Sequence, residues 1–316
     1  MTECISKIDL VYLWVNGNDP EWQKKHDKFT GGTKRKAEVD GEGRYADNDE
    51  LKYSLRSVEA YAPWINRIFI VTDNQVPAWL DTSNPRIRLV DHSEIMPEVA
   101  RPSFNSSVIE HFICRIPDLS EHYLYANDDM YFNRPAAPSD FFAPDGLPIL
   151  RMNRRPFRKL LLNFRKKIQK KPLSHYNTVV QNAALLVEQK FGKYYGAKAH
   201  HNIDAYLKSH CLHVEQLFKD ELEPTFSNHV RTSNDVQRSL YYYTALAEKC
   251  GHLRYVTQKE SLRVHIQNKK HYKKFDNTTP LLFCMNDSEY AKNSDRLYAA
   301  EFLQHRFPVK SEFEKP

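Results

Sequence analysis

The chain has 316 residues, of which 41% are hydrophobic and 27% are charged, a composition typical of a folded protein with one large or two small domains. Its net charge of +6 suits anionic partners. No helix-turn-helix, zinc-finger or RNA-binding signature is present, so we do not expect nucleic acid among those partners.

Hydrophobic runs alternate with helical patterns over the first 130 residues. The runs predict strands at 8–15, 67–73, 86–91 and 122–127, and the intervening patterns include helices at 51–62 and 107–116. Strands that alternate with helices are typical of an α/β fold with a mostly parallel, Rossmann-like (GT-A-like) sheet. Ligands of such sheets bind beyond the carboxyl ends of the strands.

Residues 151–316 have a different pattern. Helices are predicted at 174–190, 200–222 and 235–250, and a short strand at 281–287. The basic segment 154–171 forms an amphipathic helix that either lies on anionic lipid or is solvated and packed by its leucines. We expect regions 1–150 and 151–316 to share one site, or to form one continuous domain.

Acidic and amide side chains follow two of the predicted strands. Asp128 and Asp129 follow the strand at 122–127, and Asn286 and Asp287 end the strand at 281–287. Carboxylates at a strand end can bind a divalent cation, whereas the alternative is a solvated turn. These four side chains offer the oxygen ligands that Mg²⁺ or Mn²⁺ requires, so we predict a metal site with Asp128 and Asp129 also taking part in catalysis.

The loop after the first strand offers an aromatic ring and polar groups. Trp14, Asn16, Gly17 and Asp19 suit recognition of a uracil base and its ribose, although core packing explains Trp14 nearly as well. Asp73, which ends the second strand, is a further candidate for contact with the substrate, with a structural role as the alternative.

The five cysteines bear on the compartment. They are widely spread and none has C-x-x-C spacing, which is typical of reduced thiols in a cytosolic protein. The first seven residues are too short and too polar for a signal peptide, and no run reaches the ~18 apolar residues that cross a bilayer. We therefore expect a cytoplasmic protein, or one bound peripherally to the inner face of the cell membrane.

Four segments resemble the conserved regions of the Stealth family: residues 8–22, the block 44–142, His200-His201 with 227–237, and residues 284–287. This family includes bacterial capsule and exopolysaccharide sugar-phosphate transferases and the animal N-acetylglucosamine-1-phosphotransferase. The resemblance implies that residues 1–150 bind a UDP-sugar and that residues 151–316 close the site. It also implies transfer of a sugar 1-phosphate to a hydroxyl of a polysaccharide or lipid-linked glycan, with release of UMP.

The resemblance also implies roles for individual residues. Arg231 is expected to grip phosphate oxygens, with a surface ion pair as the alternative, and Arg44 is a second candidate for that role. His200 is the expected general base, and His201, which could replace it, and Asn48 are expected to contact substrate.

Two other functions remain open at this point. One is a metal-dependent glycosyltransferase that uses the same donor and releases UDP. The other is a non-catalytic subunit of a polysaccharide assembly complex.

Overall fold

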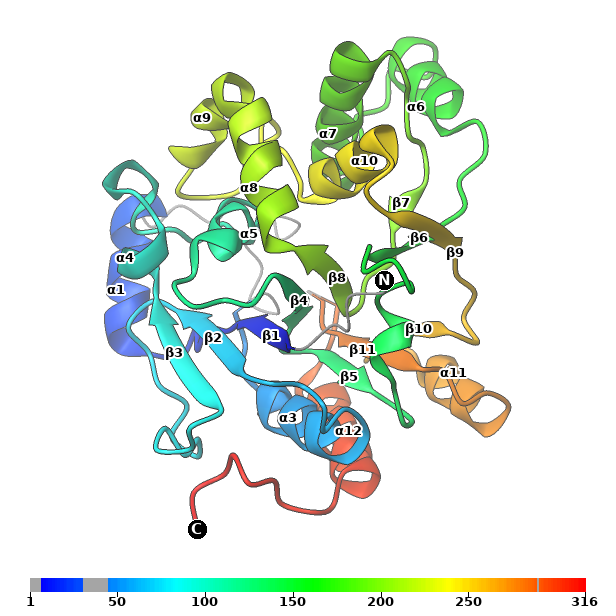
Figure 1. Cartoon of the computed structure of the whole chain (residues 1–316). Coiled ribbons are helices and arrows are strands. Elements are labelled where there is room, and N and C mark those ends of the chain that lie inside the picture. Colours follow the sequence, from blue (N-terminus) through cyan, green and yellow to red (C-terminus); the bar gives the residue numbers. More distant parts are fainter. Residues whose placement is uncertain (1–6, 31–44, 289) are drawn as a thin grey trace.

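The computed structural model describes residues 7–30, 45–288 and 290–316. A five-stranded sheet with the order β3-β2-β1-β4-β8 forms its centre (Figure 1). The strands are β1 (Ile8–Leu13), β2 (Ile68–Thr72), β3 (Ile87–Asp91), β4 (His122–Asn127) and β8 (Asp204–Leu207). Neighbours among the first four run parallel, and β8 pairs antiparallel with β4. The predicted α/β class with a mostly parallel sheet is confirmed.

Both faces of the central sheet are buried, and β1 shows why. Leu10 and Tyr12 point into a core shared with Leu51 of α3 (Glu50–Tyr61), whereas Val11 points to the opposite core. This alternation follows from the two-residue period of a strand. Helices α1 (Pro20–Thr30), α4 (His92–Ile95) and α5 (Ser106–Phe112) complete the first region, with 3₁₀ turns at Glu98–Ala100, Ile113–Arg115 and Pro138–Asp140.

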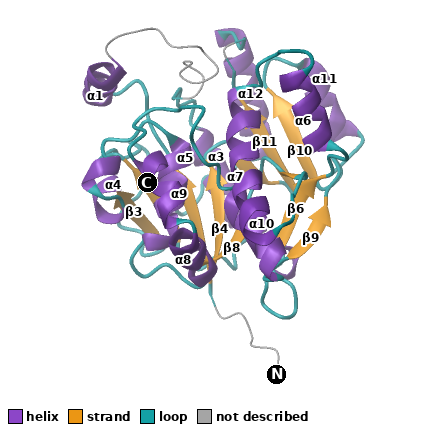
Figure 2. Cartoon of the chain, turned by 90° about the horizontal axis from the view of Figure 1, so that it is seen from above, coloured by secondary structure: helices purple, strands orange, loops and turns teal. Residues whose placement is uncertain are grey.

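Two three-stranded sheets lie beside the central one (Figure 2). One has the order β10-β11-β5, formed by β10 (Ser261–His265), β11 (Leu282–Asn286) and β5 (Met130–Phe132). The other has the order β7-β6-β9, formed by β7 (Lys198–Ala199), β6 (Ile149–Asn153) and β9 (His252–Tyr255). The chain after residue 150 therefore contributes strands as well as helices, and β11 pairs with β5 of the first region.

The helices of the second region cover these sheets. They are α6 (Arg158–Lys167), α7 (His175–Phe191), α8 (Lys208–Leu217), α9 (Lys219–Phe226), α10 (Ser239–Glu248), α11 (Lys269–Tyr272) and α12 (Asn293–Arg306), with a 3₁₀ turn at Lys273–Asp276. Among the helices described, none has both the length and the apolar character to span a bilayer.

One secondary-structure prediction is wrong. We expected a helix over 200–222 that begins at the two histidines, but 204–207 is β8 and α8 begins only at Lys208. Tyr206 of β8 stacks on Tyr123 of β4, with ring centroids 5.5 Å apart. Pairing with the exposed edge of β4 therefore overrides the local helical pattern.

Candidate functional site

A cavity of about 530 Å³ lies at the carboxyl ends of β1, β2 and β4. This is the expected ligand position for a parallel sheet. Nine residues predicted from the sequence line it: Trp14, Asp73, Asp128, Asp129, His200, His201, Arg231, Asn286 and Asp287. Residues from distant parts of the sequence thus meet at one place.

A single backbone contact brings the two acidic segments together. Asp128 and Asp129 occupy the turn between β4 and β5, and β5 pairs antiparallel with β11. The amide of Met285 donates a 2.9 Å hydrogen bond to the carbonyl oxygen of Asp129. The end of β11, with Asn286 and Asp287, therefore lies beside the turn.

The acidic turn carries carboxylates that repel one another. Burial, then Glu50, raises the pKa of Asp129 to about 7. Burial and the neighbouring carboxylates Glu50 and Asp129 also raise the pKa of Asp128 well above its ordinary value. Asp129 Oδ1 is buried and accepts no hydrogen bond from the described residues. A cation would relieve both the repulsion and the missing contact, so this oxygen-rich set fits Mg²⁺ or Mn²⁺.

Arginines hold the other two predicted metal ligands. Arg263 donates to Asn286 Oδ1, and Arg296 Nε lies 2.7 Å from Asp287 Oδ2. The amide oxygen of Asn286 and each carboxylate oxygen of Asp287 have two lone pairs, so these contacts orient the oxygens without using up their acceptor capacity.

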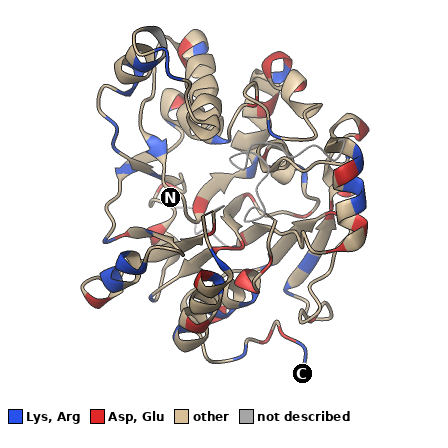
Figure 3. Cartoon of the chain, turned by 180° about the vertical axis from the view of Figure 1, so that it is seen from behind, with Lys and Arg blue, Asp and Glu red and all other residues tan. Residues whose placement is uncertain are grey.

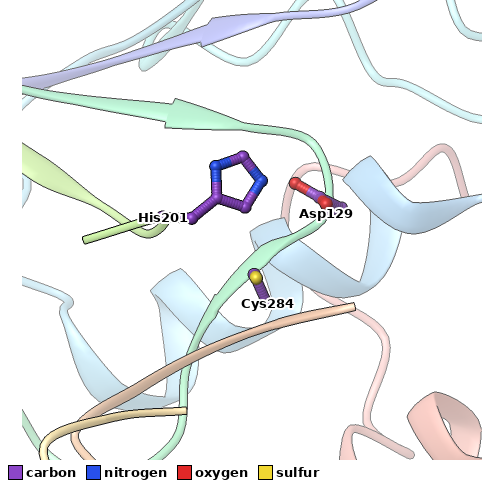
Figure 4. A group of neighbouring side chains, drawn as sticks. All are labelled: Asp129, His201 and Cys284. Carbon is purple, nitrogen blue, oxygen red and sulfur yellow. The ribbon is translucent and has the colours of Figure 1, made fainter. Parts of the chain in front are cut away.

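His201 and Cys284 lie next to Asp129 (Figure 4), and the three ligand atoms are within 4.8 Å of one another. Burial raises the pKa of the Cys284 thiol. Mg²⁺ and Mn²⁺ prefer oxygen ligands, so we do not expect the Cys284 sulfur to bind such an ion. Burial, together with Arg263 and Arg238, lowers the pKa of His201 to about 3. His201 is thus a neutral imidazole facing Asp129.

His200 has a different environment. It is only 2% exposed, with Nδ1 at 2.8 Å from Ser261 Oγ and Nε2 at 2.8 Å from Asp204 Oδ1. The second contact has the distance of an ion pair without hydrogen-bond alignment. Both ring nitrogens therefore face protein groups.

Three arginines line the cavity: Arg231, Arg238 and Arg263. Arg231 Nη2 donates a 3.0 Å hydrogen bond to Ser106 Oγ. Arg238, at the start of α10, is buried, pairs with Asp204 and Glu110, and lies over the ring of Tyr125 at 4.8 Å. The cavity is therefore lined by arginines as well as by the acidic turn, a combination that suits a metal-bound diphosphate.

The first loop is close to the cavity, but three of its predicted residues support it rather than line it. The amide of Gly17 donates to Tyr45 O at 2.8 Å, and a Cβ at position 17 would lie 2.5 Å from Tyr45 Cβ. Asn16 and Asp19 both bond to Gln75. The Gly17 contact holds the backbone of Tyr45, which lines the cavity, and the Gln75 contacts fix the first loop itself. Direct donor binding by Asn16, Gly17 and Asp19 stays a prediction.

The remaining predicted residues have distinct positions. Asn48 Nδ2 donates to Glu50 Oε1 at 2.8 Å, so it orients a carboxylate of the acidic group. Asp73 pairs with Lys25 Nζ at 2.9 Å. Arg44 lies outside the described residues.

The cavity residues that sequence reasoning missed include Glu50, Tyr176, Arg238 and Arg263. A signal existed for Glu50, because it ends the acidic run 47–50 at the start of a predicted helix. No local pattern distinguished Arg238 and Arg263 from the other basic residues of the chain.

Comparison with known proteins places the chain in a family. Residues 6–34 match the model described as Stealth protein CR1, conserved region 1, and residues 44–150 match Stealth protein CR2, conserved region 2. The exopolysaccharide phosphotransferase cps2G of Lactiplantibacillus plantarum is 30% identical over 98% of this chain and 96% of its own length. The chain belongs to the Stealth family.

Other Stealth relatives carry related names. The capsular polysaccharide phosphotransferase fcs1 of Haemophilus influenzae is 32% identical over 90% of this chain and 79% of its own. The exopolysaccharide phosphotransferase SCO6023 of Streptomyces coelicolor is 50% identical over 44% of this chain, a segment that spans 24% of that protein.

Solved structures give a more distant likeness. The galactosyltransferase LgtC aligns over 95% of both chains at 11% identity with a TM-score of 0.44. The glycosyltransferase GlyE of Streptococcus pneumoniae aligns over 96% of this chain at 11% identity with a TM-score of 0.43. At this distance the likeness assigns neither a residue nor a substrate.

Proposed function

We propose that this protein transfers a sugar 1-phosphate from a UDP-sugar to a hydroxyl group of a capsular or extracellular polysaccharide, with release of UMP. One observation carries the proposal: a paired carboxylate turn and two arginines face the same cavity at the carboxyl edge of the sheet, in a Stealth chain. Relatives named for phosphotransfer in capsule and exopolysaccharide synthesis support the reaction class.

Asp128 and Asp129, with Asp287 from β11, would hold a divalent cation. Such an ion neutralises the charge of the donor diphosphate when it is bound. Glu50 contributes to the same negative field, and Asn48 fixes its carboxylate. The chain thus offers an oxygen-rich site before substrate arrives.

His201 is the better candidate for the general base. Its imidazole is neutral and lies beside Asp129 in the cavity, whereas both ring nitrogens of His200 face protein groups. A pKa of about 3 makes His201 a weak base in the free protein. The negative charges of a bound diphosphate would raise that pKa and bring it closer to working pH.

The acceptor oxygen attacks the β-phosphorus, the bond from that phosphorus to the bridging oxygen breaks, and UMP leaves. Arg231 would bind the oxygens of the transferred phosphoryl group, where a guanidinium fork matches two oxygens at once. Arg238 would act through Asp204, which fixes the His200 ring next to the base. Most of the rate enhancement would come from positioning and charge.

Helix α6 would bring the protein to a membrane that carries the acceptor. Phe157, Leu160, Leu161, Phe164 and Ile168 each leave more than half of their surface exposed. Basic residues of α6 and of the segment before it lie on the same outer corner of the molecule (Figure 3). Apolar side chains flanked by cations suit an anionic membrane surface, where a lipid-linked acceptor would be embedded.

The released nucleotide tests the proposal. Purified protein is incubated with a panel of UDP-sugars, Mg²⁺ or Mn²⁺ and oligosaccharide acceptors. UMP is the expected product; release of UDP would instead indicate an ordinary glycosyltransferase, and absence of turnover with every donor would favour a non-catalytic subunit.

A further inference from the structure

Beside the cavity, and outside its lining, a guanidinium is buried without a counter-charge. Arg158, the first residue of α6, is only 6% exposed. Its Nη1 and Nη2 atoms have no hydrogen-bond partner among the described residues. A buried charge without a partner costs several kcal/mol, by order of magnitude. Such a group needs an anion.

The groups around Arg158 do not supply one. Lys198 of β7 has a lowered pKa of about 8, caused first by burial and then by Arg158, Arg155 and Arg263, so these four cations lie close together. No carboxylate in the described part of the chain lies within ion-pair distance of Arg158 or Lys198. Arg158 and Lys198 are therefore the two cations of this cluster that are both partly or fully buried and without an ion-pair partner among the residues that the structure describes.

The segment before β7 packs on the start of α6. A Cβ at Gly196, two residues before Lys198, would lie 3.4 Å from Arg158 Cβ and 3.5 Å from the carbonyl oxygen of Arg155. Lys198 Nζ sits 4.8 Å from the ring centroid of Tyr176, and Tyr176 lines the cavity. Arg155, three residues before Arg158, is exposed. The cluster adjoins the catalytic cavity through one aromatic side chain.

We propose that Arg158 and Lys198, assisted by Arg155, form a second phosphate-binding site that holds a phosphate group of the acceptor. This inference rests on the proposed function, because a phosphodiester polymer presents a phosphate next to its growing end. Two sources share this chemistry: the preceding diester of the polymer, and the diphosphate of a lipid carrier. Arginine with lysine around one anion is the usual protein solution for either.

Binding, measured without turnover, tests the site. Calorimetry is performed on the full chain with inorganic phosphate, dimethyl phosphate and pyrophosphate as probes. Arg158→Gln and Lys198→Gln should each weaken binding about tenfold or more, which corresponds to ~1.4 kcal/mol. Lys310→Gln, the same change at an exposed lysine, should leave this binding unchanged.

The outcomes distinguish the two sources of the phosphate group, and they distinguish a failure of this second site from a failure of the proposed sugar-phosphate transfer. Tighter binding of dimethyl phosphate indicates the polymer diester, and tighter binding of pyrophosphate indicates the carrier diphosphate. If the Arg158→Gln variant does not fold, the binding of the probes to the Lys198→Gln variant tests the site. The site is disproved if no probe binds, or if both variants bind as the unmodified protein does. Because no turnover is measured, that failure would leave the sugar-phosphate transfer itself untouched.

Discussion

Asp129 and Met285 are 2.9 Å apart, from the carbonyl oxygen of the first to the amide of the second. This contact joins the turn after β4 to the end of β11. It puts Asp128 and Asp129 from the first half of the chain beside Asp287 from the second. The acidic wall of the cavity depends on this join, and several measurable properties follow from it.

Replacing Asp129 by asparagine should stabilise the metal-free protein and abolish its activity. The folded pKa of about 7 lies above the ordinary value of 3.8, so the ionised carboxylate destabilises the fold as pH rises through that interval. The gain in melting temperature for Asp129→Asn should therefore be larger at about pH 8 than at about pH 5. Mg²⁺ should raise the melting temperature of the unmodified protein and not that of the variant. Asp118→Asn, at an exposed position, is the control, and equal gains at both pH values would contradict the model.

The two histidines should respond differently to substitution. His201→Gln removes the proposed base, so kcat should fall about 10²–10⁴-fold with little change in melting temperature. His200→Gln removes a buried ring between Ser261 and Asp204, so its main effect should be a lower melting temperature. Turnover rates and thermal melts of both variants decide this. A stable His201→Gln protein with normal kcat would exclude His201 as the base.

Arg231→Lys tests the grip on the transferred phosphoryl group. Lysine keeps the charge and loses the fork, and the lost contact is strongest in the transition state, so kcat should fall more than KM for the donor rises. Steady-state kinetics over a range of donor concentrations measure both constants. Arg134→Lys, at an exposed arginine, should change neither. A rise in KM with normal kcat would limit Arg231 to ground-state binding.

The exposed face of α6 should bind anionic liposomes. The triple change Leu160→Ser, Leu161→Ser and Phe164→Ser should abolish co-sedimentation with anionic liposomes at low salt, and high salt should release the unmodified protein. Leu297→Ser with Val309→Ser removes equally exposed apolar groups elsewhere and should have no effect. Failure of the unmodified protein to sediment with anionic liposomes would indicate that α6 is a solvated helix, and equal sedimentation with neutral liposomes would contradict a role for anionic lipid.

The sequence allowed correct prediction of the strands in the first half because their period is local. The runs at 67–73 and 122–127 match β2 (Ile68–Thr72) and β4 (His122–Asn127) within one residue at each end. The rule that ligands bind beyond parallel strands then located Asp128 and Asp129 near the cavity. Both steps need only neighbouring residues and a known geometry.

The strand β8 and the buried arginines were not predicted because they depend on contacts between residues that are distant in the sequence. The segment Asp204–Leu207 became β8 because it pairs with β4, about 80 residues earlier in the chain. Arg238 and Arg158 look like ordinary basic residues until the fold removes them from solvent. A pattern of charges gives no information about which charge is left without a partner.

The most direct test of the central claim follows the β-phosphorus of the donor. A UDP-sugar with radioactive phosphorus at the β position is incubated with the protein, Mg²⁺ and an oligosaccharide acceptor, and the products are separated. Sugar-phosphate transfer predicts that the label moves into the acceptor as a phosphodiester while unlabelled UMP is released. Label that stays in the nucleotide as UDP, with an unlabelled sugar on the acceptor, would contradict the mechanism.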